Sequence, residues 1–121
     1  MGKEKTGKVV TRERILSSIG LAYRASLLTS GSDAVEQALR AGAVELLILA
    51  EDGSERQKEK LARVASQEET EVRAFGTNLE LGKAIGRDSR IAIAILDEGF
   101  AGKLMKMIDE YKSILSDTKT E

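Results

Sequence analysis

Two segments made almost wholly of apolar residues, ELLILA at residues 45–50 and IAIAIL at residues 91–96, constrain the fold of this chain more than any other feature. Each run is bounded by polar residues, which is typical of a strand that is covered on both faces. A third run, EVRAF at residues 71–75, also has the composition of a strand. Because a doubly covered sheet needs helices on both sides, the runs predict an α/β domain.

The segments between the runs have the periodicity of amphipathic helices. In residues 11–25 one helical face carries Ile15, Ile19 and Ala22, and a short extended piece follows at residues 27–29. The segment after it has a similar face, formed by Val35, Ala38, Leu39 and Gly42. The last helix has the longest apolar face, which consists of Phe100, Leu104, Met107, Ile108, Tyr111 and Leu115.

Capping residues mark where these helices begin and end. Hydroxyl side chains with the spacing of N-caps occur at Thr11, at Ser54 with Gln57, and at Thr77 with Glu80. Glycine is the preferred residue just after a helix, where the backbone turns left-handed. Gly42 and Gly86 are therefore predicted to end the helices that precede them.

The 121 residues are enough for one domain, which we expect to span residues 11–115 between disordered tails at residues 1–10 and 116–121. The net charge is only −1, yet residues 1–31 hold six Lys and Arg against two acids, and the first ten residues form a basic tail. Binding to nucleic acid requires a local basic face rather than a basic protein. The overall charge therefore leaves an RNA-binding function open.

The composition argues against several classes of function. The chain has no histidine and no cysteine, which removes the commonest general acid or base, the thiol nucleophile and the commonest metal ligand. No apolar run approaches the ~20 residues of a membrane span, and the start lacks the apolar stretch of a signal peptide. We expect a cytoplasmic protein without a membrane association, a cofactor or a bound metal.

Two acidic pairs, Glu51-Asp52 and Asp97-Glu98, follow apolar runs and are the candidates for an enzymatic site. Carboxylates in such places can hold Mg²⁺. They are equally natural at the turn from a strand to a helix, where acids complement the helix N-terminus. Since no glycine-rich phosphate loop or nucleophile motif accompanies them, the structural interpretation is favoured and we expect no enzymatic activity.

Five pieces in order resemble the L7Ae/L30e ribosomal-protein family, and most of all its small bacterial members of the YlxQ type. They are GLAYRA, the SG that opens a helix ending in AG, the strand that closes in LAED, LGKAIG, and the strand that ends in DEGFA. Each piece alone is a weak signal, but their order and spacing are consistent over residues 14–108. The resemblance implies a three-layer α-β-α sandwich around a mixed four-stranded sheet.

The resemblance also implies a function, which is the binding of structured RNA, either kink-turns or ribosomal RNA, with the ribosome as a further candidate partner. In the family the RNA lies against the start of a glycine-led helix and against the loop before the last strand. The positions that match these contacts are Gly31, Ser32, Asp33, Ala34, Gln37, Arg87, Asp88, Ser89, Arg90, Ile91 and Ala92.

Elementary chemistry supports such a site. A helix N-terminus offers unpaired backbone N–H groups to a phosphate, and Gly31 permits close approach. Asp33, Gln37 and Arg40 share a helical face opposite the apolar one, so they are expected to meet a groove. Either of the apolar side chains at residues 91–92 can lie against an unstacked base.

At three of these positions the chain departs from the family pattern. Relatives that bind RNA commonly have Asn-Glu followed by Lys where this chain has Asp33, Ala34 and Gln37. The base-reading residues are therefore altered, and two interpretations remain. The first is an RNA-binding protein with changed specificity. The second is a non-catalytic protein-interaction module that keeps the fold and has lost kink-turn binding.

Overall fold

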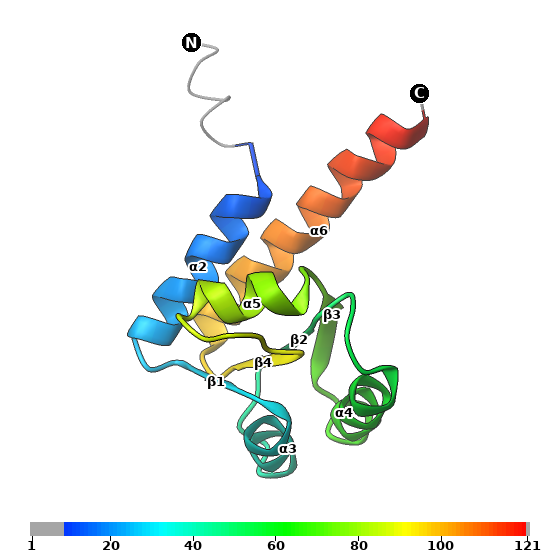
Figure 1. Cartoon of the computed structure of the whole chain (residues 1–121). Helices are drawn as coiled ribbons and strands as arrows, with labels where there is room; N and C mark the ends of the chain where they lie inside the picture. The colour runs from blue at the N-terminus through cyan, green and yellow to red at the C-terminus, as the bar shows by residue number, and fades with distance from the viewer. Residues whose placement is uncertain (1–8, 121) are drawn as a thin grey trace.

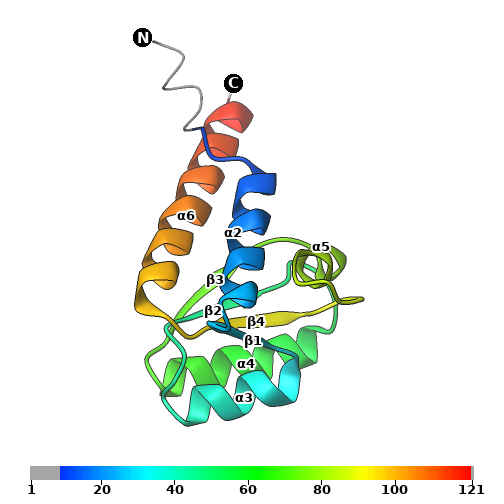
Figure 2. The same cartoon turned by 90° about the vertical axis from the view of Figure 1, so that its left-hand side faces the viewer.

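The computed structural model describes residues 9–120, with side chains up to Ser116. Along the chain the elements are α2 (Arg12–Arg24), β1 (Leu28–Ser30), α3 (Ser32–Arg40), β2 (Leu46–Leu49), α4 (Glu55–Gln67), β3 (Glu71–Ala74), α5 (Asn78–Ala84), β4 (Ala92–Ile95) and α6 (Glu98–Thr120). They form three layers (Figures 1 and 2), with α2, α5 and α6 on one face of the sheet and α3 and α4 on the other. The predicted α-β-α sandwich is confirmed.

The sheet is mixed and has four strands in the order β1-β4-β2-β3. Strand β4 pairs antiparallel with both β1 and β2, whereas β2 and β3 are parallel. The two strongest apolar runs therefore occupy the two central positions, where both faces are covered. All residues of β2 and β4 are buried, as their sequences predict.

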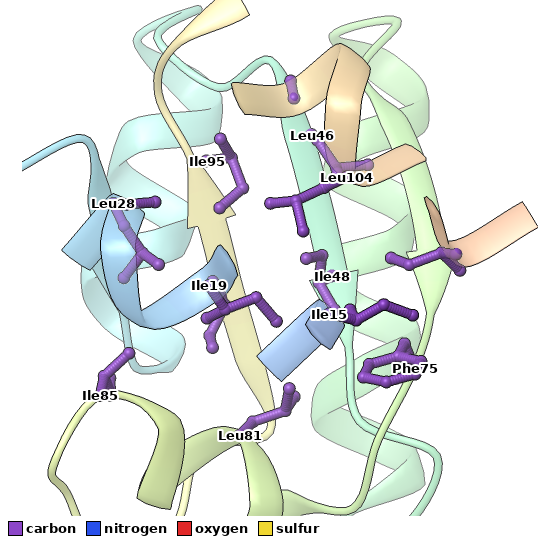
Figure 3. Close-up of a cluster of buried hydrophobic side chains, with 14 of the residues drawn as sticks. Ile15, Ile19, Leu28, Leu46, Ile48, Phe75, Leu81, Ile85, Ile95 and Leu104 are labelled. Atoms are coloured by element: carbon purple, nitrogen blue, oxygen red, sulfur yellow. The ribbon is translucent and has the colours of Figure 1, made fainter. Parts of the chain in front are cut away.

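The alternation in IAIAIL divides the core into two parts. Ile93 and Ile95 point toward α2, α5 and α6 and join the larger cluster, part of which Figure 3 shows. Ala92 and Ala94 point to the other face, where they join the cluster beneath α3 and α4. Small side chains on that face leave room for α3 to lie close to the sheet.

The predicted caps are present. The Thr11 hydroxyl accepts from the Arg14 N–H and the Ser54 hydroxyl from the Gln57 N–H, at 3.2 Å in both cases. Thr77 and Glu80 form a complete capping box at the start of α5. Gly42 and Gly86 have positive φ just after α3 and α5, as predicted.

The carboxyl end of the chain differs from the expectation of a tail from residue 116, since α6 continues to Thr120. Nothing after Gly102 interrupts it, because no glycine or proline follows. At the other end, most of the expected basic tail, residues 1–8, lies outside the described residues, while Val10 already packs against the core. The helices in residues 9–120 include none long and apolar enough to cross a membrane.

Candidate nucleic-acid interface

The two predicted RNA-contacting segments lie together at one edge of the sheet. Because β4 runs antiparallel to both neighbours and β2 parallel to β3, the carboxyl ends of β1, β2 and β3 meet at the edge where β4 begins. The start of α3 follows β1 directly, and the loop at residues 87–91 leads into β4. A hydrogen bond from the Gly31 N–H to the Ala92 carbonyl, at 3.3 Å, joins the two segments.

The N-terminus of α3 has no side-chain cap. Its N-cap residue is Gly31, whose φ of +93° and extended ψ are strained for any residue with a side chain. The other helices in residues 9–120 have a side chain that accepts from a first-turn N–H: Thr11, Ser54, Thr77 and, at the start of α6, Asp97. The first-turn N–H groups of α3 are therefore open to an external acceptor.

Arg90 connects the loop to the end of β1. Its Nε donates to the Ser30 hydroxyl at 3.0 Å, and its Nη1 donates to the Ser89 carbonyl at 2.7 Å. Its backbone N–H donates to the Asn78 carbonyl at 2.9 Å, so the same residue also joins the loop to α5. Arg90 is half-buried, and its hydrogen bonds hold the loop beside β1 and α5 while its guanidinium adds positive charge to this edge.

The rest of the loop is exposed and lies across α5. Arg87 extends toward α2, where its Nη2 donates to the Tyr23 hydroxyl at 3.0 Å. Asp88 and Ser89 are exposed, and their backbone packs directly on Gly82. A Cβ at Gly82 would lie 2.6 Å from the Ser89 Cα, so a side chain there would displace the loop.

Fewer apolar side chains are accessible at the end of the loop than predicted. Ile91 is half-buried, and its side chain faces the turn at residues 51–54, where a Cβ on Gly53 would lie 2.8 Å from the Ile91 Cγ2. Ala92 is fully buried beneath α3 and α4. This corrects the expectation for Ala92, whose side chain lies inside the core because β4 is covered on both faces. Only Ile91 presents an apolar side chain here.

The outer face of α3 carries the residues predicted for it. Asp33, Ala34 and Gln37 are exposed. Arg40 is also exposed, and its Nε donates to the Glu36 carboxylate at 3.0 Å. Hydrogen bonds from Arg40 and Lys60 lower the pKa of Glu36, so this carboxylate stays ionised between its two cations.

A third segment, the turn at residues 51–54 with the start of α4, completes the edge and was not predicted to be part of it. The Ser32 hydroxyl donates to Gln57 Oε1 at 3.3 Å, which ties the start of α3 to the start of α4. Asn78 donates to Asp52 Oδ1 from its backbone N–H at 2.7 Å and from its side chain at 3.0 Å. The sequence shows that this turn follows β2, but only the order of the strands in the sheet shows that it lies next to the other two segments.

The two acidic pairs lie at opposite edges of the sheet. Asp52 holds the start of α5, as described above, and Asp97 accepts from the Phe100 N–H at 2.8 Å at the start of α6. Asp52 and Asp97 therefore have the structural role considered for them above, as acids that accept from N–H groups at the start of a helix. Across residues 9–120, no group of three or more acids is arranged to hold a metal ion.

Residues 13–105 match the ribosomal protein L7Ae/L30e/S12e/Gadd45 family. The chain belongs to this family. Among curated members, the RNA-binding protein YlxQ of Bacillus subtilis is 32% identical over 91 residues, which cover 75% of this chain and 91% of that protein. RNA-binding protein YlxQ of Enterococcus faecium is 29% identical over 98 residues, which cover 81% and 94% of the two chains.

A solved structure agrees with this membership. A Bacillus halodurans protein of unknown function superposes with a TM-score of 0.75 and 38% sequence identity, covering 78% of this chain and 96% of that one. The L7Ae/L30e resemblance and the fold predicted from the sequence are both confirmed. The residues of the interface stay a prediction, now with a defined geometry.

Proposed function

We propose that this member of the L7Ae family is a non-catalytic RNA-binding protein that recognises kink-turn-like structured RNA through the sheet edge described above. The observation that carries the proposal is the uncapped start of α3, which the Gly31 and Arg90 hydrogen bonds hold beside the loop at residues 87–91. The names of the two YlxQ relatives support RNA as the partner. As part of the same proposal, the protein acts in the cytoplasm, in translation or on the ribosome.

Each part of the edge offers a different contact. The open N–H groups of α3 and the partial positive charge of its N-terminus suit a phosphate oxygen. Arg87 is exposed on the loop of this edge, and its guanidinium, which reaches Tyr23 on the α2 side, can bind a phosphate there through its remaining N–H groups. Ile91 offers an apolar edge to a base that has left the stack. Phosphate contacts set the position of the RNA, whereas base contacts give specificity.

The base-reading surface differs from the Asn-Glu and Lys pattern of RNA-binding relatives. Asp33, Ala34 and Gln37 are all exposed on the start of α3, so the altered side chains stand on the surface itself. A good bidentate contact to a base contributes about 1–3 kcal/mol of discrimination. With these three residues we propose a weaker or altered preference for the G·A pairs of a standard kink-turn.

The test is a titration of the whole chain with a standard kink-turn RNA, and with the same RNA lacking its sheared G·A pairs, by calorimetry at low salt. We expect binding at micromolar concentrations and a small preference for the intact RNA. The triple variant Asp33→Asn, Ala34→Glu, Gln37→Lys should increase that preference by about tenfold or more, because it restores base contacts.

The matched control changes Lys103, an exposed lysine on α6 in the opposite layer, to Gln, and it should bind like the wild type. No binding by the wild type or the triple variant at tens of micromolar would refute the proposal. If neither protein binds RNA, a pull-down with the wild type that still recovers protein partners after nuclease treatment would favour the protein-interaction module instead.

A further inference from the structure

The outer side of α4 carries a row of cations. Arg56, Lys60 and Arg63 are spaced at i, i+4 and i+7, which places them on one side of the helix, and all three are exposed. The opposite side of α4 is buried against the sheet by Leu61 and Val64. The row therefore faces away from the core. From Arg56 to Arg63 it extends about 10 Å along the helix axis.

The row begins at the candidate RNA site. Helices α3 and α4 lie side by side beneath the sheet (Figure 2). Two contacts hold them in that arrangement, Ser32 with Gln57 at 3.3 Å and Lys60 with Glu36 at 3.3 Å. Because Gln57 is in the first turn of α4, its neighbour Arg56 lies at the same edge as the start of α3. From there the row leads away from the site.

The charges nearby leave this surface positive. Arg40 on α3 adds a fourth cation, and Glu36 is shared by Arg40 and Lys60. Arg56 and Arg63 form no ion pair with any residue in the part of the chain that the structure describes. We call these four cations, Arg40, Arg56, Lys60 and Arg63, the basic strip.

The two acids of α4, Glu55 and Glu59, lie on the side of the helix nearer to β3. Glu55 pairs with Lys58 at 3.1 Å, and Glu55, Lys58 and Glu59 line a cavity of about 240 Å³ together with residues of β2 and β3. Lys58 itself is buried and donates to the Ala50 carbonyl at 3.0 Å. Glu55 therefore lies away from the basic strip, whereas Glu59 adjoins it, three residues after Arg56 and four before Arg63, so cations still outnumber acids along the strip.

We propose that the basic strip binds the phosphate backbone of an RNA stem that leaves the candidate site, and this inference rests on the function proposed above. A phosphate backbone is favoured over a protein partner because protein interfaces usually need apolar anchors at their centre. The large apolar side chains that are exposed in residues 9–116, namely Val9, Leu21, Leu79, Ile114 and Leu115, all lie outside α3 and α4. The strip offers cations without an apolar centre, which is the chemistry of backbone contacts.

The experiment compares three RNAs. One is a kink-turn with both stems cut to the minimum, and the other two extend one stem each by about ten base pairs. The wild type should bind one extended RNA more tightly than the minimal RNA, with a steeper dependence on salt between about 50 and 200 mM. The double variant Arg56→Gln, Arg63→Gln should lose that gain, about five- to tenfold at low salt, and its salt slope should fall by about 1–2.

The matched control is Lys103→Gln, Lys106→Gln, which removes the same charge from exposed positions on α6 and should behave like the wild type. Binding of the minimal RNA should be equal for all three proteins, which shows that the variants are folded. If the wild type binds the minimal RNA but gains nothing from either extension, the strip inference is overturned and the proposed function stands. A gain that persists in the double variant also overturns it. If the wild type binds none of the RNAs, both proposals fail.

Discussion

Glu80 has two structural roles, as the ion-pair partner of Arg12 and as part of the capping box of α5, and Glu80→Gln removes only the first. Its carboxylate accepts from Arg12 Nε at 2.9 Å and Arg12 Nη2 at 2.6 Å, and it closes the capping box by accepting from the Thr77 N–H at 3.0 Å. A glutamine can serve as the third residue of a capping box as glutamate does. Glu80→Gln therefore removes the charge and leaves the cap.

The magnitude follows from the pKa of this carboxylate. The hydrogen bond from Arg12, and then the one from the Thr77 backbone, lowers the pKa of Glu80 from 4.5 to about 2. That difference corresponds to at most roughly 3 kcal/mol of folding free energy. The side chains of Arg12 and Glu80 are 31% and 33% exposed, so screening by water reduces the effect to about 1–2 kcal/mol.

The sign of the pH dependence is fixed by the direction of the shift. Because the folded state binds this proton less readily than the unfolded state, the stabilisation is fully present above pH 4.5 and is lost as the pH falls toward 2. Glu80→Gln should therefore lower the free energy of unfolding by about 1–2 kcal/mol at neutral pH. At about pH 2.5 the wild type and the variant should differ much less, since the wild-type carboxyl is then gaining its proton.

The assay is urea unfolding of both proteins at several pH values between 7 and 2.5, followed by circular dichroism. Other acids also titrate in this range, but they are common to both proteins and cancel in the difference. Glu59→Gln is the control, since this exposed glutamate forms no ion pair within the described residues, and it should change stability by less than about 0.5 kcal/mol at every pH. A wild-type to Glu80→Gln difference that stays constant from neutral to acid pH would refute the reasoning.

Three further changes test the cap of α5, the contact between Gly82 and the loop, and the core. Thr77→Ala should cost about 1 kcal/mol in urea unfolding through loss of the α5 cap. Gly82→Ala should cost more, about 1–3 kcal/mol, because its Cβ would meet the Ser89 backbone, and amide exchange in the loop at residues 87–91 should quicken. Ile48→Ala, in the centre of the core, should cost about 2–5 kcal/mol, with thermal unfolding as the measurement.

The sequence predicted the layers and the caps because both depend on local patterns. The runs at residues 45–50 and 91–96 are central strands, and Thr77 caps α5 with Glu80 as its spacing indicated. The strand order was not predictable in the same way, since β1 is only three residues long and pairs with β4, some sixty residues later. That pairing is decided by tertiary packing rather than by any local signal.

For the candidate site, the sequence and the family pattern located the segments but not the contacts within them. Ala92 lies in the core because both faces of β4 are covered, and its pairing opposite Leu49 places its side chain on the face beneath α3 and α4. The hydrogen bond from Arg90 to Ser30 joins residues 60 positions apart in the chain, so no local sequence pattern predicts it. The contribution of the turn at residues 51–54 likewise follows only from the sheet order.

The stability of α5 and the geometry of the candidate site are connected. The Asn78 carbonyl accepts from the Arg90 N–H, and Gly82 provides the flat surface on which the loop at residues 87–91 rests. The start of α5 is held in turn by its capping box and by the Arg12–Glu80 pair. The Arg12 guanidinium carbon also lies 5.3 Å from the centre of the ring of Phe75, a core residue, so the Arg12–Glu80 pair is in contact with the core. Weakening the Arg12–Glu80 pair should loosen the loop before the whole domain unfolds, so this remote ion pair helps to set the position of the residues proposed to contact RNA.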